Sequence, residues 1–530
     1  MKNYILLIVL FLSQFSFSQS KMLVFFSDKP GTIFTESTLF SAKGIARRNK
    51  KSIVINEYDL PINPSYLSSI GADGSIEKTS KWLNAIVFSS LLSQEQLLEK
   101  YTFIERIVDI DVSLKSTIKK EVTIGLEKSI DYGLATQQVQ QLNLDCLHDL
   151  GFTGDGVYIA VIDAGFSNMN TLSYFDFVYQ NNRVLDSYDF VLNQTDVYGN
   201  SEHGTMVSSC IFGEKNQGQE KYVGTAKDVD IALYRSEDAS VEILIEEFDL
   251  VRALERCDSV GVDIANISLG YFEFDDATTS HIYADLDGNT TIAALGVNVA
   301  ISKGIAVVMA AGNSGPNYIS TPCDADDGLC VGAVDEFGDY ASFSSVGPNA
   351  DEQIKPDVVA RGQDALVVTP NDIVTPANGT SFASPIMCGA TACLIQANPS
   401  KSVQEIFDAI RLSASQNTFP DNLRGYGIPN FCLANTILNS SAGISENDLS
   451  NLLLYPNPAK NDLTVYGFEN DLSVEYVIYS SIGAFVKLGT AITIDGYFKI
   501  NVSSITAGNY ILEIVSEGKV IGKEQLFIVD

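Results

Sequence analysis

Short, uninterrupted apolar runs alternate with helix-like stretches through the middle of this chain. The runs have the length of strands that are buried in a parallel sheet: Val157–Ile162, Val229–Leu233, Val262–Ile267 and Ile305–Met309. Helices are predicted in the intervals, at His203–Phe212, Val241–Cys257 and Thr291–Lys303. Repeated β-α-β order predicts an α/β fold in which helices cover both faces of a parallel sheet. Ligand sites in such sheets lie beyond the carboxyl ends of the strands.

A different pattern precedes this region, over residues 19–130. Lys81–Phe88 and Ile107–Val112 are predicted as strands, and Ser93–Lys100 begins with a capping-box pattern that favours a helix. These elements predict a small α/β unit. The basic run Lys43–Lys51 is interpreted as a solvated helix face, because charge runs usually have that role.

The pattern changes again after residue 440. A polar, Gly/Ser-bearing linker is predicted at residues 441–451. From residue 452 to 530, short β-runs separated by turn residues predict a small β-sandwich: Asp462–Tyr466, Glu475–Tyr479, Tyr497–Val502, Tyr510–Val515 and Gln525–Val529. The central α/β domain therefore spans residues 131–440.

The first 18 residues have the form of a secretory signal peptide. Met1-Lys2 precedes the apolar run Ile5–Leu12, and Ser16 and Ser18 place small residues at the cleavage site. The run is too short to span a bilayer, and no other stretch of the sequence qualifies. Export of a mature chain without a transmembrane segment is expected.

Charge is distributed unevenly along the chain. Residues 1–130 hold 16 lysines and arginines against 13 acidic residues, whereas the remainder holds 18 against 53. A strongly acidic body argues against nucleic acid as a partner. The acidity itself is interpreted as a property that favours solubility.

The eight cysteines are too few for a disulfide scaffold in 530 residues. Cys323 and Cys330 flank a short acidic loop and are the candidates for a disulfide in an oxidising compartment. A metal site is the alternative, but the three histidines do not lie near this pair at ligand spacing. Cys388 and Cys393 are predicted to be buried packing residues.

The segment Asn378–Pro385 presents Ser381 at the start of a long apolar helix that runs to about Ala397. A hydroxyl there lies among free backbone N–H groups at the positive end of the helix dipole, which suits a nucleophile whose attack creates an oxyanion. Pro385 is expected to be tolerated because first-turn amides lack intrahelical partners. The alternative is an ordinary helix cap, since serine favours that place.

Two further stretches favour the nucleophile over the cap. An apolar run ends at Asp163, and His203-Gly204-Thr205 opens a helix. The chain order Asp, His, Ser differs from that of the α/β-hydrolases, where serine comes first. Ala383 also breaks the glycine pattern of a nucleophile elbow. His148 and His281 have no comparable context and are interpreted as structural.

These motifs resemble those of the subtilisin-like serine peptidases (subtilases, peptidase family S8). The Asp-Ser/Thr-Gly, His-Gly-Thr and Gly-Thr-Ser-Met-Ala motifs of that family read DAG, HGTM and GTSFASP here. Asn313, in an Ala-Ala-Gly-Asn-Ser-Gly segment between His203 and Ser381, matches the oxyanion asparagine. The resemblance covers about residues 131–440 and implies a subtilisin-like parallel sheet.

The resemblance implies a role for each matched residue. Ser381 would attack a peptide carbonyl, His203 would move its proton and Asp163 would orient the imidazole. Asn313 and the Ser381 N–H would bind the oxyanion. Small residues would line the first specificity pocket, namely Ser268, Leu269, Gly270, Ala310, Ala311 and Gly312. No acid can be assigned to its floor, so cleavage after medium-sized or large apolar residues is expected.

Ala164 departs from the family pattern, because a Ser/Thr usually follows the catalytic Asp and can hydrogen-bond to it. Losing one neutral hydrogen bond costs on the order of 1 kcal/mol, which should tune the Asp without abolishing its charge. The chemistry needs no cofactor. Structural calcium is common in subtilases, but the oxygen-rich run Asp285–Asn289 has the composition of an ordinary turn and no site is assigned.

The flanking regions also resemble known segments. Residues 19–130 are similar to the inhibitor-chaperone prosegments of secreted subtilases, whose C-terminal end could occupy the substrate groove. Tyr455–Pro458 and Ala507–Tyr510 resemble the C-terminal sorting domains read by the type IX secretion machinery. A substrate- or carbohydrate-binding module is the alternative for the tail. For the whole chain, a secreted serine endopeptidase is predicted, with a catalytically silent binding protein and a serine esterase as alternatives.

Overall fold

The computed structural model describes residues 20–32, 34–110, 132–215, 221–440, 453–466, 472–480, 485–494, 497–516 and 519–529. The chain divides into two compact units, Met1–Asn435 and Thr436–Asp530. Three predictions lie outside the described residues: the signal peptide 1–18, the maturation junction near residues 115–131, and the linker 441–451.

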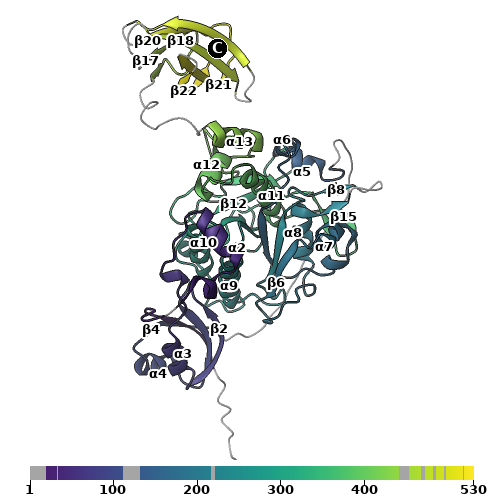
Figure 1. Cartoon of the computed structure of the whole chain (residues 1–530), viewed down its shortest axis with the longest axis vertical. Coiled ribbons are helices and arrows are strands. Elements are labelled where there is room, and N and C mark those ends of the chain that lie inside the picture. Colours follow the sequence, from purple (N-terminus) through teal and green to yellow (C-terminus); the bar gives the residue numbers. More distant parts are fainter. Residues whose placement is uncertain are drawn as a thin grey trace, which may run out of the picture. The chain divides into compact units, whose positions relative to one another are not determined.

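The first unit is built on a sheet of seven strands that are all parallel, in the order β13-β12-β11-β10-β5-β9-β6. Figure 1 labels β6 and β12 of this sheet. The strands are β5 (Tyr158–Asp163), β6 (Val184–Asp189), β9 (Asp230–Arg235), β10 (Ile264–Ile267), β11 (Ala306–Ala310), β12 (Leu329–Val334) and β13 (Val358–Arg361). Every residue of β5, β10 and β11 is buried, which explains why these strands read as continuous apolar runs.

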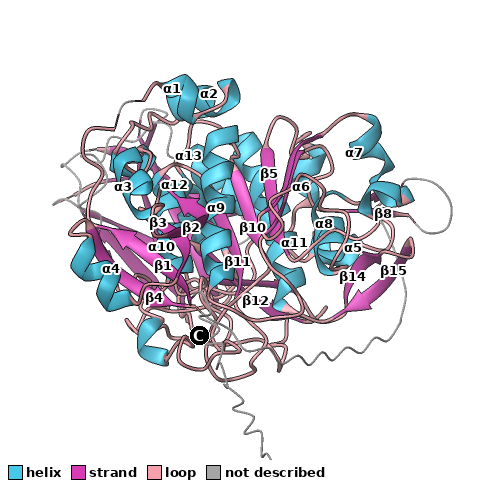
Figure 2. Ribbon diagram, turned by 90° about the horizontal axis from the view of Figure 1, so that it is seen from below, coloured by secondary structure: helices cyan, strands magenta, loops and turns pink. Residues whose placement is uncertain are grey.

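Helices α8, α9, α10 and α11 complete the layers around the sheet (Figure 2). Helix α8 (His203–Phe212) packs on α11 (Thr380–Ala397), and α9 (Ile245–Val260) packs on α10 (Ile292–Ser302). The predicted α/β sheet with helices on both faces is therefore confirmed. Further elements surround it: α5 (Thr136–Gln140), α6 (Asp145–Asp149), α7 (Asp176–Gln180), α12 (Val403–Ser413), α13 (Phe431–Ser440), and the pairs β7 (Glu214–Lys215) with β8 (Tyr222–Val223) and β14 (Ala365–Thr369) with β15 (Ile373–Ala377).

Residues 20–110 form a smaller antiparallel sheet in the order β2-β3-β1-β4. Its strands are β1 (Ser20–Phe26), β2 (Gly74–Ser80), β3 (Ala85–Ser90) and β4 (Ile104–Asp109). The accompanying helices are α1 (Glu36–Leu39), α2 (Ala42–Lys50), α3 (Pro64–Ile70) and α4 (Gln94–Lys100). Ser93 caps α4 in a capping box, as its sequence pattern predicts.

The two faces of this small sheet belong to two different hydrophobic cores. Met22, Val24 and Phe26 pack with residues of α3 and α4. The alternate residues Leu23 and Phe25 belong to the core of the central domain. Because successive side chains of a strand point to opposite faces, one face of the sheet covers its own helices and the other packs against the central domain.

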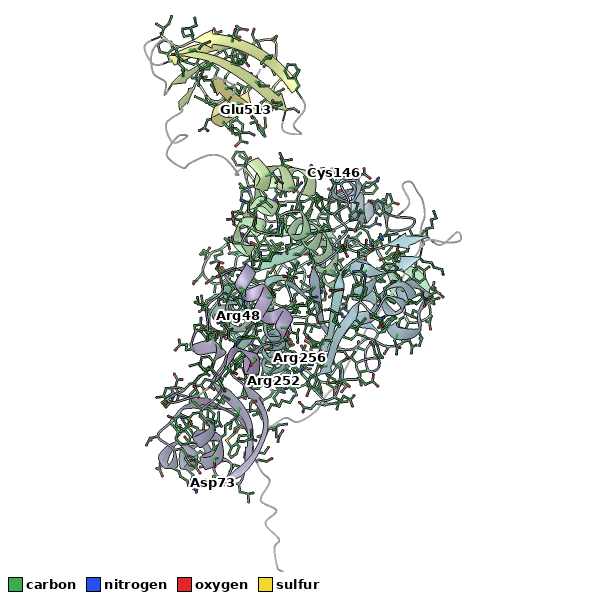
Figure 3. The ribbon with its side chains drawn as sticks, in the orientation of Figure 1. Arg48, Asp73, Cys146, Arg252, Arg256 and Glu513 are labelled. Atoms are coloured by element: carbon green, nitrogen blue, oxygen red, sulfur yellow. A yellow bond between two sulfur atoms is a disulfide. The ribbon has the colours of Figure 1, made fainter. Side chains whose placement is uncertain are left out.

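Helix α2 corrects the prediction of a solvated basic face at Lys43–Lys51. Arg47 and Arg48 are only 5% and 3% exposed. Both contact the carboxylate of Asp258 near the end of α9, and Arg48 also reaches Asp59, 2.8 Å from its Nη2 (Figure 3). The sequence pattern could not indicate this burial, because the acidic partner Asp258 lies more than 200 residues away.

The second unit contains two antiparallel sheets, β16-β17-β20 and β19-β18-β21-β22. Its strands are β16 (Leu453–Tyr455), β17 (Asp462–Tyr466), β18 (Ser473–Ser480), β19 (Phe485–Ile492), β20 (Tyr497–Asn501), β21 (Gly508–Ser516) and β22 (Lys519–Ile528). Inward residues of both sheets, including Val465, Ile478 and Leu512, share one core. The strand-rich tail agrees with the predicted β-sandwich.

Two disulfides lie in the first unit. One joins the predicted pair Cys323 and Cys330, and the other joins Cys146 of α6 to Cys432 of α13. Cys388 and Cys393 are free and buried, as are Cys210 and Cys257. Among the described residues, none of the helices has the length and apolar character to cross a bilayer.

Candidate active site

Asp163 and His203 meet at the carboxyl end of strand β5. Asp163 is the last residue of that strand and is fully buried, and His203 is the first residue of α8. The Nδ1 atom of His203 lies 2.9 Å from Oδ1 and 3.0 Å from Oδ2 of Asp163. The carboxylate therefore fixes the orientation of the imidazole, and Nε2 is the ring nitrogen on the side away from Asp163.

Two motif glycines permit this meeting. The Gly204 N–H donates to the Gly165 carbonyl at 3.1 Å, so the backbone after β5 touches the first turn of α8. A Cβ on Gly204 would lie 2.5 Å from that carbonyl oxygen, which real Cβ atoms do not tolerate. The glycines therefore allow the close backbone approach that places the imidazole beside the carboxylate.

A backbone hydrogen bond compensates for Ala164 beside Asp163. The Ala164 N–H donates to Oδ1 of Asp163 at 2.8 Å. The Ala164 carbonyl accepts from Nε of Arg235 at 3.1 Å, and Arg235 also pairs with Asp189. A main-chain donor thus serves the Asp163 carboxylate in a position where the family pattern has a hydroxyl side chain.

Ser381 lies in the first turn of α11, directly after Gly379 and Thr380. Pro385 is the sixth residue of this helix, so the expectation that it lies among partnerless first-turn amides is wrong. The N–H that Pro385 lacks would have bonded to the Ser381 carbonyl. That carbonyl accepts instead from the Ser268 hydroxyl at 2.8 Å.

Ser268 is itself held by a short polar chain. Asn266 Nδ2 donates to Ser268 Oγ at 2.9 Å, and Ser384 Oγ donates to Asn266 Oδ1 at 2.9 Å. All three side chains are buried. This network ties the end of β10 to the first turns of α11 and satisfies the carbonyl that Pro385 leaves open.

Asn313 follows strand β11 and is oriented by Thr380. Its Oδ1 accepts from the Thr380 N–H at 2.9 Å and from the Thr380 hydroxyl at 3.1 Å. With the oxygen occupied, the Nδ2 donor of Asn313 is directed away from Thr380. Asn313 lines the same pocket as Ser381, so both predicted residues lie at one site.

His203, Asn313 and Ser381 line one pocket of about 320 Å³. The predicted wall residues Ser268, Leu269, Gly270, Ala310 and Gly312 line it as well. Ala311 does not belong to its lining and is fully buried behind it. The pocket therefore brings together His203, Asn313 and Ser381, which were predicted to act on substrate. Asp163 does not line it but is hydrogen-bonded to His203.

Glu237 also lines this pocket, and sequence reasoning missed it. It lies two residues beyond β9, the strand that neighbours β5. Sequence signals could have found it, since carboxyl-end loops of parallel strands carry functional side chains. Burial raises the pKa of Glu237 well above its usual range, and the nearby carboxylates of Glu246 and Glu242 raise it further.

The other histidines are structural, as predicted. His148 bonds to the Tyr132 hydroxyl at 2.9 Å and to the Thr225 carbonyl at 3.0 Å, and burial lowers its pKa. His281 forms a buried ion pair with Glu247. In the oxygen-rich run, Asp287 accepts from the N–H groups of Asn289 and Thr290, so its carboxylate stabilises a turn.

A buried carboxylate–imidazole pair, a serine at a helix start and a neighbouring amide donor at one sheet edge define a serine peptidase of α/β class. The chain belongs to the subtilase family, whose model matches residues 154–427. Residues 21–124 match the peptidase S8 propeptide domain of Bacteroidota, and residues 453–528 match a C-terminal sorting domain of the type IX secretion system.

Three similar proteins illustrate the relationship. Alkaline elastase YaB of Bacillus sp. (strain YaB) is 30% identical over 56% of this chain and 68% of its own. Subtilisin Savinase of Lederbergia lenta is 29% identical over 57% of this chain and 97% of its own. The crystal structure of a cold adapted subtilisin-like serine proteinase is 26% identical, covers 53% of this chain and 88% of its own, and has a TM-score of 0.41.

Proposed function

We propose that this protein is a secreted serine endopeptidase that uses Asp163, His203 and Ser381 as its catalytic triad. The observation that carries the proposal is the Asp163–His203 pair, hydrogen-bonded beside a pocket that Ser381 and Asn313 also line. In this scheme, Ser381 Oγ attacks the peptide carbonyl while His203 Nε2 accepts its proton. The tetrahedral oxyanion is bound by Asn313 Nδ2 and the Ser381 N–H.

Collapse of that intermediate completes acylation. His203 returns the proton to the leaving amine, which departs and leaves an acyl-enzyme on Ser381. Water then repeats the sequence as nucleophile and releases the acid. Asp163 stays ionised throughout and stabilises the imidazolium that forms in each step.

Secretion and maturation form the second part of the proposal. The propeptide domain at residues 21–124 supports synthesis as a zymogen, and the sorting domain at residues 453–528 supports export to the cell surface or beyond. Self-cleavage near residues 115–131 would free the central domain. No cofactor takes part in this chemistry, and the natural substrates would be proteins or peptides.

The decisive experiment compares wild type with Ser381→Ala. Only wild type should lose residues 19–130 by self-cleavage, and only wild type should hydrolyse casein. A fluorophosphonate probe should label wild type at Ser381. Equal processing of both proteins would contradict self-cleavage, and a folded wild type that never labels would support the silent binding protein.

A short-chain ester assay separates the peptidase from the esterase. A peptidase should hydrolyse casein with kcat/KM well above that of an esterase control, whereas an esterase would act on the ester alone. Both activities depend on the same serine, so Ser381→Ala serves as the background for each measurement.

A further inference from the structure

Four strand ends lie side by side at the catalytic edge of the sheet, in the order β11, β10, β5 and β9. Ala310 and Ser268 lie at the ends of β11 and β10, on one side of Asp163 at the end of β5. Glu237 follows β9, on the other side. The pocket that contains His203 and Ser381 therefore has walls of different chemistry, small and neutral on one side and acidic on the other.

An extended substrate would present consecutive side chains to these two walls. If the residue before the scissile bond enters the wall of Ser268–Gly270, the preceding side chain points the opposite way, because side chains alternate along a strand. That direction is toward the ends of β5 and β9, where Ala164 and Glu237 line the pocket. The charge of Glu237 then decides which side chain is favoured.

Glu237 has no cationic partner within the part of the chain that the structure describes. Arg235, two residues earlier, is turned toward Asp189 and the Ala164 carbonyl. Glu246 is occupied by the N–H groups of Asp238 and Ile243, at 2.9 Å and 3.0 Å, and so stabilises the loop after Glu237. A half-buried carboxylate on a pocket wall without a counter-ion is stabilised by a cation from the ligand.

The groups that face Glu237 strengthen this preference. They are the carboxylates of Glu246, Glu242 and Asp163 and the phenol of Tyr271, and none of them is positive. Burial raises the pKa of Glu246 to about 8, and burial with the charge of Asp275 raises that of Glu242 to about 7. Because none of these groups is positive, they do not repel an entering ammonium or guanidinium group, and the charge of that group favours the ionised form of the neighbouring carboxyls.

We propose that Glu237 selects substrates with lysine or arginine as the second residue before the scissile bond. The inference rests on the proposed peptidase function and names its substrate class. The sequence offers a substrate of this kind in the chain itself, since the segment expected to be cleaved carries Lys115, Lys119, Lys120 and Lys128, all outside the described residues.

The test uses the processed full-chain enzyme and two chromogenic peptides, succinyl-Ala-Ala-Lys-Leu-p-nitroanilide and its norleucine analogue. Norleucine has nearly the length of lysine but no charge. Because the same triad cleaves both peptides, the ratio of their kcat/KM values measures the effect of the lysine charge at the wall that contains Glu237. Wild type should prefer lysine about tenfold or more, the range for a hydrogen bond to a charged group. Moving lysine to the third residue before the bond should remove the preference.

Two variants locate the effect. Glu237→Gln should bring the ratio close to one, whereas Glu273→Gln, which changes an exposed acid outside the pocket lining, should retain it. A wild-type ratio near one, or the same ratio in Glu237→Gln, would overturn the proposal. Should Glu237→Gln not fold, the wild-type ratio must still rise as the pH is raised, because the pKa of Glu237 is held well above its usual range and the carboxyl ionises while the lysine keeps its charge. A flat ratio overturns the proposal.

Fluorophosphonate labelling keeps this result distinct from that of the peptidase proposal. An enzyme that labels at Ser381 and cleaves the norleucine peptide without preferring lysine would contradict only the role of Glu237. An enzyme that neither labels nor cleaves either peptide would contradict the peptidase proposal itself.

Discussion

At the scale of single residues, Asn313 depends on its neighbour for its direction. Thr380 occupies the side-chain oxygen twice, through its N–H and its hydroxyl. In the proposed mechanism, replacing Asn313 with Ala removes a donor that acts only when the oxyanion forms. We expect a roughly hundredfold or greater loss of kcat with little change in KM. Steady-state kinetics on the purified variant provide the measurement.

Thr380→Val is the matched control for Asn313. It keeps the backbone donor to Asn313 but removes the hydroxyl, which bonds to Asn313 Oδ1 and accepts from the Gly312 N–H at 3.1 Å. Thr380→Val leaves the Asn313 amide in place with one restraint fewer, so its loss of kcat should be smaller than that of Asn313→Ala. An Asn313→Ala enzyme as fast as wild type would exclude the oxyanion assignment, and Thr380→Val would then have no reason to be slow.

The buried pair of His281 and Glu247 predicts a pH-dependent stability. Burial lowers the pKa of His281, but the hydrogen bond and charge of Glu247 outweigh it, so the pKa is raised overall. A raised pKa means that the pair stabilises the fold fully below the unfolded value of about 6.5. This contribution is lost as the pH rises through the raised folded value.

His281→Asn in a Ser381→Ala background tests this dependence without autolysis. The difference in unfolding free energy between the two proteins, measured by urea denaturation from pH 5 to 9, should shrink as the pH rises. Glu247 also accepts from the Ala293 N–H at 2.8 Å, so a constant part of the difference is expected to remain. A difference that grows with pH would contradict the assigned sign.

At the scale of elements, helix α11 contains Pro385, which lacks the N–H that would bond to the Ser381 carbonyl. The Ser268 hydroxyl, just after strand β10, donates to that carbonyl instead. Ser268→Ala removes the donor to the Ser381 carbonyl and should cost about 1–3 kcal/mol of stability, the penalty for a buried acceptor left open. Pro385→Ala supplies an N–H that can reach the same carbonyl. The cost of Ser268→Ala should therefore be smaller in the Pro385→Ala background.

A double-mutant cycle on Ser268 and Pro385 measures this coupling. Urea denaturation of the four Ser381→Ala proteins gives the unfolding free energies. Residues that share one acceptor are expected to couple by 0.5 kcal/mol or more. Strict additivity would mean that the Ser268 hydroxyl does not replace the missing helix bond.

Elements with a strong local signal could be predicted from sequence. The four apolar runs correspond to β5, β9, β10 and β11, at whose carboxyl ends the pocket of His203 and Ser381 lies, and α8 matches its predicted bounds. Strand β6 was missed because Val184–Asp189 is a half-polar edge strand without an apolar run. Strand β12 contains Gly332 and β13 is only four residues long, so neither gives a clear pattern.

The residues of the site also differ in whether a local sequence pattern could predict them. Asp163, His203, Asn313 and Ser381 each stand in a recognisable motif, so they could be named before their geometry was known. Glu237 and the second disulfide, Cys146–Cys432, have no local signal. Their relevance depends on which strand ends and helices become neighbours, and that information belongs to the topology.

At the scale of the whole first unit, charge joins residues 20–110 to the central domain. Lys43 pairs with Asp230, Arg47 and Arg48 with Asp258, and Lys78 with Asp249. The imbalance between a basic N-terminal segment and an acidic body was visible in the sequence. Its pairing was not, because each partner is separated by at least 170 residues.

Trp82 is the only tryptophan of the chain and lies at this interface. It is 4% exposed, belongs to the core of the central domain, and its backbone N–H donates to Glu255 of α9 at 3.1 Å. Its fluorescence therefore reports the docking of residues 20–110 without any added label. Removing a buried ion pair of Arg48 should therefore change the urea dependence of this emission much more than removing the exposed Lys43–Asp230 pair.

Arg48→Met in a Ser381→Ala chain should destabilise docking by about 2–5 kcal/mol, because the buried carboxylates of Asp258 and Asp59 each lose one of their cationic partners. Lys43→Met removes an ion pair whose lysine is 42% exposed, which should cost at most about 1 kcal/mol. Urea titration followed by Trp82 emission should therefore show a much lower midpoint for Arg48→Met alone. Equal midpoints would mean that Arg48 contributes no more than a surface charge, and the docking would then rest on the apolar face of β1 and β3.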